Sequence, residues 1–251
     1  MKLYDLHTHT TMSDGSLTVD ELLAEEAARG FGLGVSDHLF CCKLLTLRDV
    51  EHYLDELSRR DVLRGLEANL GENFTLPQKL NSRLDYIIAS VHTVTTPQGT
   101  PLSLGPYFCA RAGDEGAPPY TQSFTHDEAK WYLTQITDML EYDFENQRVD
   151  ILGHCTVNPF YDTLIGEAWL DGWEDKVISL CVKHKVAMEI SGLWCCPPKK
   201  MVEKALLAGA TVSFGSDCHI KAHTANLAYP QDLIKLFNIT DDKIYTPKRQ
   251  K

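Results

Sequence analysis

The stretch Asp5-Leu6-His7-Thr8-His9 lies near the start of the chain and is followed closely by Ser13-Asp14-Gly15. Residues 2–7 have the mixed, largely apolar character of a short buried strand. Side chains two residues apart on a strand point to the same side, so His7 and His9 would direct two imidazoles to one place. Imidazoles beside carboxylates suit a zinc, manganese or iron ion. The pair alone is a weak signal, and its meaning depends on whether the rest of the chain supplies partners.

The length and composition of the chain fit one soluble domain. With 251 residues, the chain is long enough for one large core, and we expect residues 1–251 to form a single domain. The 24 basic and 35 acidic residues give a net charge of −11, which argues against an extended nucleic-acid groove. The sequence shows neither an apolar run of membrane-spanning length nor a signal-peptide pattern. We therefore expect a cytoplasmic protein whose eight cysteines are reduced thiols.

Predicted strands and helices alternate along the chain. The helix expected over residues 16–29 has Thr18 as its N-cap and Glu21 three residues later, which is a capping box. The predicted strands are residues 2–7, 32–38, 62–68, 84–92, 149–154, 186–191 and 210–219. Because consecutive parallel strands need a crossover helix between them, this order predicts an α/β fold with a TIM-like (β/α)7 barrel of parallel strands.

Six of the seven predicted strands end at or near a histidine, glutamate or aspartate. These residues are His7 and His9, His38, Glu67, His92, His154, and Asp217 with His219. In parallel barrels the C-terminal strand ends converge on one mouth, where the active site lies. One such residue would be explained by packing, but six strands with the same feature predict a metal site.

Residues 93–125 interrupt the alternation. This region is rich in Gly, Pro, Thr and Ser and has no clear periodicity. A loop of this length inside a compact domain is usually functional or mobile. We interpret it as a loop insertion that acts as a lid or specificity element over the site. A disordered surface excursion is the alternative for its middle part, residues 111–119.

The motifs resemble those of the PHP (polymerase and histidinol phosphatase) family. They are His7-x-His9, Ser13-Asp14-Gly15, Ser36-Asp37-His38, Gly65-Leu-Glu67, Ser90-Val-His92, Gly153-His154 and Gly215-Ser-Asp217-x-His219. The motifs keep their order and extend over nearly the whole chain. The resemblance implies a distorted (β/α)7 barrel that holds two or three divalent metal ions, which would be manganese, iron or zinc.

The resemblance also implies a set of metal ligands. It would place the first ion on His7, His9, Glu67 and Asp217, the second on a bridging Glu67 with His92 and His154, and a third on Asp14, His38 and His219. Some family members have histidine at the position of Asp14. A carboxylate there would favour manganese or iron over zinc. Glu189 and Ser191, on the sixth strand, are expected to orient ligands or substrate.

The function that the resemblance implies is hydrolysis of a small phosphate ester. Two ions about 3.5–4 Å apart would share a bridging hydroxide, and the third would polarise a phosphoryl oxygen. Asp217, His219 and Glu67 are the candidate catalytic residues. Histidinol phosphate is the leading substrate, which would place the enzyme in histidine biosynthesis, and no obligatory protein partner is expected. The alternatives are a nucleotide or other sugar-phosphate phosphoesterase, a non-phosphate metallohydrolase, and a metal-loaded proofreading-type module that acts on a polymerase.

The residues that would hold the phosphate are not evident. Histidinol phosphatases of this family tend to have basic residues after the fifth-strand histidine and after the sixth-strand Ser-Gly. This chain has Asn158 and Trp194 in those regions, and neither replaces an arginine fork. Trp194 and Tyr107 are candidates for stacking on a substrate ring, with packing as the alternative. The candidate basic substitutes, each of which is alternatively a surface charge, are Arg111, Lys199, Lys200 and Lys221.

Overall fold

In the computed structural model, which describes residues 2–113 and 115–248, parallel strands form two sheets of a distorted barrel. The first sheet has the order β1 (Tyr4–Asp5), β2 (Gly32–Val35) and β3 (Leu63–Arg64). The second has the order β10 (Val212–Gly215), β9 (Ala187–Ser191), β8 (Ile151–Leu152), β5 (Ile88–Ser90) and β4 (Glu67–Asn69). β3 and β4 together occupy the predicted third strand. The predicted α/β fold of parallel strands is confirmed.

Isolated bridges join the two sheets on both sides. A parallel bridge links Thr8 to Cys218, and another links His38 to Glu67. The backbone N–H of His9 donates to the carbonyl of Cys218 at 2.9 Å, and that of Glu67 donates to the carbonyl of Asp37 at 3.1 Å. These contacts lie at the C-terminal ends of the strands. The seven strand regions therefore follow one another around the barrel in chain order.

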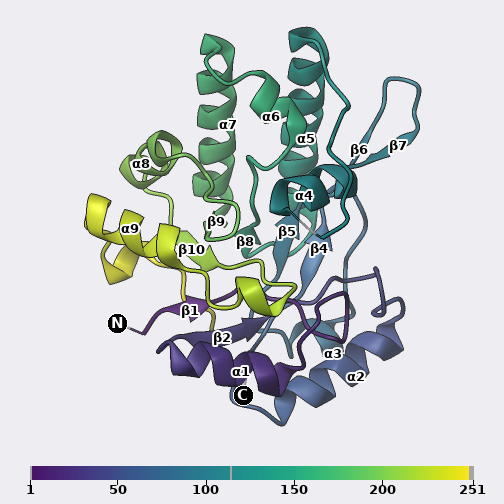
Figure 1. Ribbon diagram of the computed structural model, residues 1–251, viewed down its shortest axis with the longest axis vertical. Coiled ribbons are helices and arrows are strands. Elements are labelled where there is room, and N and C mark those ends of the chain that lie inside the picture. Colours follow the sequence, from purple (N-terminus) through teal and green to yellow (C-terminus); the bar gives the residue numbers. More distant parts are fainter. Residues whose placement is uncertain (1, 114, 249–251) are drawn as a thin grey trace.

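Helices cover the outside of the strands (Figure 1). α1 (Val19–Ala28) packs against β2, and α2 (Leu47–Ser58) packs against β3. α5 (His126–Asn146) and α7 (Ala168–His184) contact each other along their lengths. The other helices outside the insertion are α3 (Gln78–Asn81), α6 (Pro159–Thr163), α8 (Lys199–Leu207), α9 (Ala228–Phe237) and the 3₁₀ turns Lys221–His223 and Asp241–Lys243. None of the helices among the described residues combines the length and apolarity that a bilayer crossing needs.

The predicted capping box is present at the start of α1. The Thr18 hydroxyl accepts from the backbone N–H of Glu21, and the Glu21 carboxylate accepts from the backbone N–H of Thr18 at 2.8 Å. α2 has the same arrangement between Thr46 and Asp49. Each box pairs N–H groups that the first helical turn would otherwise leave without a partner.

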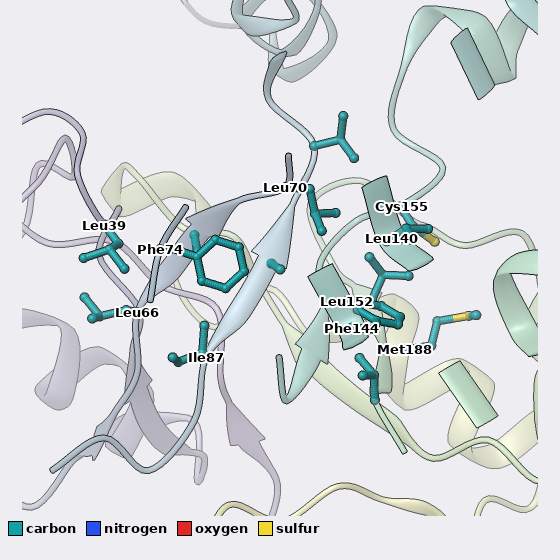
Figure 2. Packing of buried hydrophobic residues seen from close by; sticks show 14 of the residues in the cluster. Leu39, Leu66, Leu70, Phe74, Ile87, Leu140, Phe144, Leu152, Cys155 and Met188 are labelled. Carbon is teal, nitrogen blue, oxygen red and sulfur yellow. The ribbon is translucent and has the colours of Figure 1, made fainter. Parts of the chain in front are cut away.

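The main hydrophobic core lies between the strands and the surrounding helices. Figure 2 shows Leu140 and Phe144 of α5 beside Leu152 of β8 and Met188 of β9. Burying a side chain of this kind stabilises the fold by about 1.5–3 kcal/mol. This packing holds the strand ends, and the polar side chains they carry, in fixed positions.

The insertion differs from the irregular loop that the sequence predicted. β6 (Thr93–Thr95) and β7 (Pro101–Ser103) form an antiparallel hairpin, and α4 (Gly105–Ala112) follows. The hairpin projects from the body of the molecule (Figure 1). These elements were missed because each is too short to show a periodic pattern. α4 ends at Gly113, whose φ of 73° is the left-handed conformation that glycine adopts readily. Residues 115–125 contain neither helix nor strand.

Two acidic side chains, Asp5 and Glu26, are buried between β1 and α1. Both residues have no exposed surface, and both carboxylate oxygens of Glu26 lack a hydrogen-bond partner. Burial, together with the charge of Asp5, raises the pKa of Glu26 from 4.5 to about 9, and burial raises the pKa of Asp5 to about 6. The folded protein therefore holds a proton on Glu26 at neutral pH.

We predict that the Glu26→Gln variant loses part of the pH dependence of stability. A carboxyl whose pKa rises on folding stabilises the fold fully below its unfolded pKa of 4.5, and this contribution is lost as pH rises towards 9. The melting temperature of the wild type should therefore fall between pH 5 and pH 8 more than that of the variant. Thermal unfolding followed by circular dichroism measures both. Glu203→Gln, at an exposed position on α8, is the control, and equal pH slopes in all three proteins would contradict the prediction.

Candidate metal centre

The C-terminal strand ends bring all nine predicted side chains together. They are His7, His9, Asp14, His38, Glu67, His92, His154, Asp217 and His219. Glu67 lies at the centre of this cluster. Its carboxylate oxygens are 3.0–3.5 Å from ring nitrogens of His7, His9, His38, His92 and His154. Residues from positions 7 to 219 therefore meet at one end of the barrel.

The two aspartates of the cluster lie at different depths. Oδ1 of Asp217 is 3.2 Å from Nε2 of His9 and 3.5 Å from Nε2 of His7, and this carboxylate is buried. Asp14 lies at the rim, where Oδ2 is 3.5 Å from Nε2 of His38 and 3.6 Å from Nε2 of His219. The Asp14 side chain is 39% exposed. The cluster therefore has a buried floor and a rim that solutes can reach.

The Asp37 carboxylate fixes the loop that carries Asp14 by hydrogen bonds, a role that was not predicted from the sequence. The Asp37 carboxylate accepts hydrogen bonds from the backbone N–H and the hydroxyl of Thr10, both at 2.7 Å, and from the hydroxyl of Ser13. A Cβ on Gly15 would collide with the backbone of His9, so only glycine allows the loop to return this close. Asp37 was part of the quoted Ser-Asp-His motif, but the motif does not say that this carboxylate faces the loop.

Glu189 fixes the ring of His7. Its Oε1 lies 2.7 Å from Nδ1 of His7, which leaves Nε2 directed at Glu67 and Asp217. Its Oε2 accepts the backbone N–H of His154 at 2.7 Å. Glu189 thus has the orienting position expected for it. The hydroxyl of Ser191, the other expected orienting group, is buried without a hydrogen-bond partner.

The end of β10 holds Asp217 in a constrained position. Its φ of 52° lies in the left-handed region, which is uncommon for residues other than glycine but more accessible to aspartate than to most. The indole N–H of Trp194 donates to Oδ2 of Asp217 at 2.6 Å. The other oxygen, Oδ1, is therefore directed at the imidazoles of His7 and His9. The orientation of this carboxylate is therefore set by the backbone and by a neighbouring side chain.

Buried polar atoms at the floor of the cluster lack hydrogen bonds. The atoms without a hydrogen-bond partner are Nε2 of His7, both ring nitrogens of His9 and both carboxylate oxygens of Glu67. Buried polar atoms are nearly always paired, so a set of unpaired ones suits a bound ligand. Imidazole and carboxylate are donors to zinc, manganese and iron. The donor set therefore fits divalent metal ions.

Four overlapping groups have ligand atoms within 4.8 Å of one another. They are His9 with Asp14, His38 and His219; His7 with His9 and Asp217; His7 with Glu67 and His154; and His38 with Glu67 and His92. The expected third ligand set lies within the first group. His92 and His154, which were expected to share one ion, fall into different groups that each contain Glu67. Their common contact is therefore Glu67.

Burial and neighbouring charges shift the pKa values of the ligand groups in different directions. Burial by itself would raise the pKa of Glu67, but the charges of His7 and His38 hold this pKa well below its usual value. Burial lowers the pKa of His9 and of His92 to about 3. For His7, His38 and His154 the neighbouring carboxylates outweigh burial and raise the pKa, to about 9 for His38. A metal ion would therefore have to displace protons from these three histidines. Ionised carboxylates and neutral imidazoles are the ligand forms of these groups.

The candidate substrate-binding residues are mostly engaged elsewhere. Arg111 pairs with Asp162, Lys200 with Asp171, and Lys221 with Glu25. Lys199 is exposed at the start of α8. The rings of Trp194 and Tyr107 are buried. In the described part of the chain, the ion pairs of Asp14, Glu67 and Asp217 involve histidines and no lysine or arginine.

Comparisons with known proteins agree with this arrangement. The family model described as "PHP domain" matches residues 5–190. A "Probable phosphatase" from Clostridium acetobutylicum is 26% identical over 268 aligned residues, which cover 99% of this chain and 92% of the relative. A second, from Caldicellulosiruptor saccharolyticus, is 23% identical and covers 96% of this chain and 90% of its own length.

A crystal structure from Listeria monocytogenes, of a protein provisionally named a histidinol phosphatase, superposes on this fold with a TM-score of 0.66. The two chains are 16% identical, and the match covers 91% of this chain and 99% of the other. At this identity the likeness concerns the fold. The family model, in contrast, matches the sequence over most of the chain, from the first strand through β9, and the chain therefore belongs to the PHP domain family.

Proposed function

We propose that this PHP-domain protein is a metal-dependent phosphoesterase that hydrolyses a small phosphate ester, with histidinol phosphate as the leading candidate. One observation carries the proposal: nine potential ligands converge at the barrel mouth around buried nitrogen and oxygen atoms that lack hydrogen bonds. The names of the relatives, probable phosphatases and a provisional histidinol phosphatase, point to the same chemistry.

The proposed ligand sets keep Glu67 as the shared residue. His7, His9 and Asp217 would hold one ion with Glu67, and His92 and His154 would hold the second with Glu67. Asp14, His38 and His219 would hold a third. Divalent ions bound in this way neutralise the charge of a phosphate ester and lower the pKa of bound water. Manganese and iron are the preferred candidates because Asp14 adds a hard oxygen donor at the rim.

The residues of the chain have distinct proposed roles. Glu67 and Asp217 stay ionised because neighbouring imidazoles outweigh their burial, so they supply the negative charge that holds the cations. Nδ1 of His219 lies 3.1 Å from the carbonyl oxygen of Asp217, so Nε2 is the ring nitrogen that would hold the third ion with Asp14. With Glu189 and Trp194 in place, His7 and Asp217 are already oriented before the substrate binds. Pre-oriented groups of this kind lower the cost of reaching the transition state.

We expect the purified protein to release inorganic phosphate from at least one small phosphate monoester. The panel contains histidinol phosphate, a sugar phosphate, a nucleoside monophosphate, a cyclic nucleotide and a dinucleotide, each with added manganese. Chelation should abolish the release and manganese should restore it. If no ester releases phosphate while a lactone or an amide is cleaved, the metallohydrolase alternative would replace this proposal.

We predict that His92→Ala and Asp217→Asn each lower kcat by at least about 100-fold, the scale of losing an electrostatic group at a reacting centre. His92→Ala removes a proposed ligand and Asp217→Asn replaces a charged ligand by a neutral amide, while circular dichroism should show an intact fold. The matched control is His52→Ala, at an exposed position on α2. Normal turnover in either site variant would remove that residue from the site.

We predict that Glu189→Gln weakens metal binding by roughly 10–100-fold, the usual cost of losing a carboxylate that orients a ligating histidine. The amide keeps the shape of the side chain but removes the charge that contacts Nδ1 of His7. Titration of the metal-free protein with manganese, followed by calorimetry, measures the change. Glu203→Gln controls for the loss of one negative charge, and unchanged affinity in the Glu189 variant would contradict this role.

A further inference from the structure

The insertion at residues 93–125 places α4, a helix that carries Tyr107 and Phe108, beside the candidate metal centre. Just before α4, the backbone N–H of Leu104 donates to the carbonyl of His92 at 2.8 Å. Near its other end, Arg111 pairs with Asp162 at 2.9 Å, and the Tyr107 hydroxyl donates to the same carboxylate at 2.5 Å. Both ends of α4 are therefore tied to the barrel, and the side chains between them have defined positions.

Phe108 is the α4 side chain that contacts the histidines of the cluster. The centre of its ring is 5.7 Å from that of His92 and 5.3 Å from that of His154, and both contacts are edge-on. The Trp194 ring is 5.6 Å away. Phe108 is partly exposed, whereas Trp194 and Tyr107 are buried. Phe108 is therefore an α4 ring that keeps some exposed surface beside these two histidines.

The rim of the cluster sets the direction in which a substrate extends. The floor histidines His7 and His9 have no exposed surface, while His92 is 26% and His219 is 32% exposed. A phosphoryl group held by the cluster must therefore direct its leaving group outward over the rim. Phe108 borders the part of the rim that His92 forms.

Two polar side chains near Phe108, Arg111 and Trp194, already have partners. Arg111, the basic residue of α4, is engaged with Asp162 and with the Tyr107 hydroxyl. The indole N–H of Trp194 is engaged with Asp217. An anionic group or a hydroxyl placed against the Phe108 ring would lose hydration and find no hydrogen-bond partner on the ring, whereas a flat ring would gain contact with another ring.

We propose that Phe108 is a specificity residue that receives a planar aromatic or heteroaromatic ring of the leaving group. This inference rests on the proposed phosphoesterase function and narrows its substrate class. The preferred esters carry a ring within a few bonds of the phosphate. Aliphatic sugar phosphates of similar size are poorer substrates.

The test compares benzyl phosphate, which carries a planar ring, with cyclohexylmethyl phosphate, whose ring is puckered, and with ethyl phosphate, which has no ring. All three are esters of primary alcohols. We measure kcat/KM for each with the wild type, Phe108→Leu and Phe108→Trp. The ratio of benzyl to cyclohexylmethyl phosphate should fall about three- to tenfold in Phe108→Leu, the scale of one lost aromatic contact, and should be largely kept in Phe108→Trp. Phe124→Leu, which changes an aromatic residue that packs on Tyr132 and Phe160, is the control for the substitution itself.

The outcomes separate this inference from the proposed function. Phosphate release with the same substrate ratio in the wild type and Phe108→Leu would overturn the role of Phe108 and leave the phosphoesterase function standing. Release from none of these esters or of the panel above would overturn the function. Calorimetric binding of benzylphosphonate and cyclohexylmethylphosphonate then tests the aromatic surface directly, and equal affinities would overturn the inference as well.

Discussion

The structure depends on two carboxylates, Glu67 and Asp217, that are buried among imidazoles at one end of a barrel. Burying such charges is costly unless cations compensate them, and in the described part of the chain only histidines lie within ion-pair distance. The strands must therefore hold like charges together against their repulsion. The hydrophobic core between strands and helices provides the rigidity for this, and bound divalent ions would supply the missing positive charge.

A second set of residues gives the cluster its orientation. Glu189 positions His7, Asp37 positions the loop that carries Asp14, and Trp194 positions Asp217. These supports belong to different parts of the barrel wall. The supports of His7 and Asp217 bind one polar atom of each side chain and leave the other, Nε2 or Oδ1, directed at the centre of the cluster. A cluster supported in this way needs little rearrangement when a ligand binds.

The open side of the cluster differs in character from its floor. The floor is charged and buried, whereas the insertion adds aromatic side chains next to the rim. Under the proposed function, two kinds of recognition would be separated: ions and carboxylates at the floor would bind the phosphoryl group, and rings at the rim would contact the remainder of the substrate. The sole arginine of α4, Arg111, ties this helix to α6 through Asp162.

Asp14, which lies in a loop, was assigned through the resemblance to the PHP family. The sequence by itself determined the order of the strands, the capped first helix and the eight other polar residues, which lie at the strand ends. These features follow from local periodicity and from the rule that parallel strand ends share one side of a barrel. Only the tertiary structure decided the form of residues 93–112, the supporting contacts of Asp37, Glu189 and Trp194, and the place of Phe108 beside His92 and His154. The hairpin and α4 are too short for periodicity to reveal. The contacts join residues far apart in the chain, and no local pattern encodes which of these side chains meet.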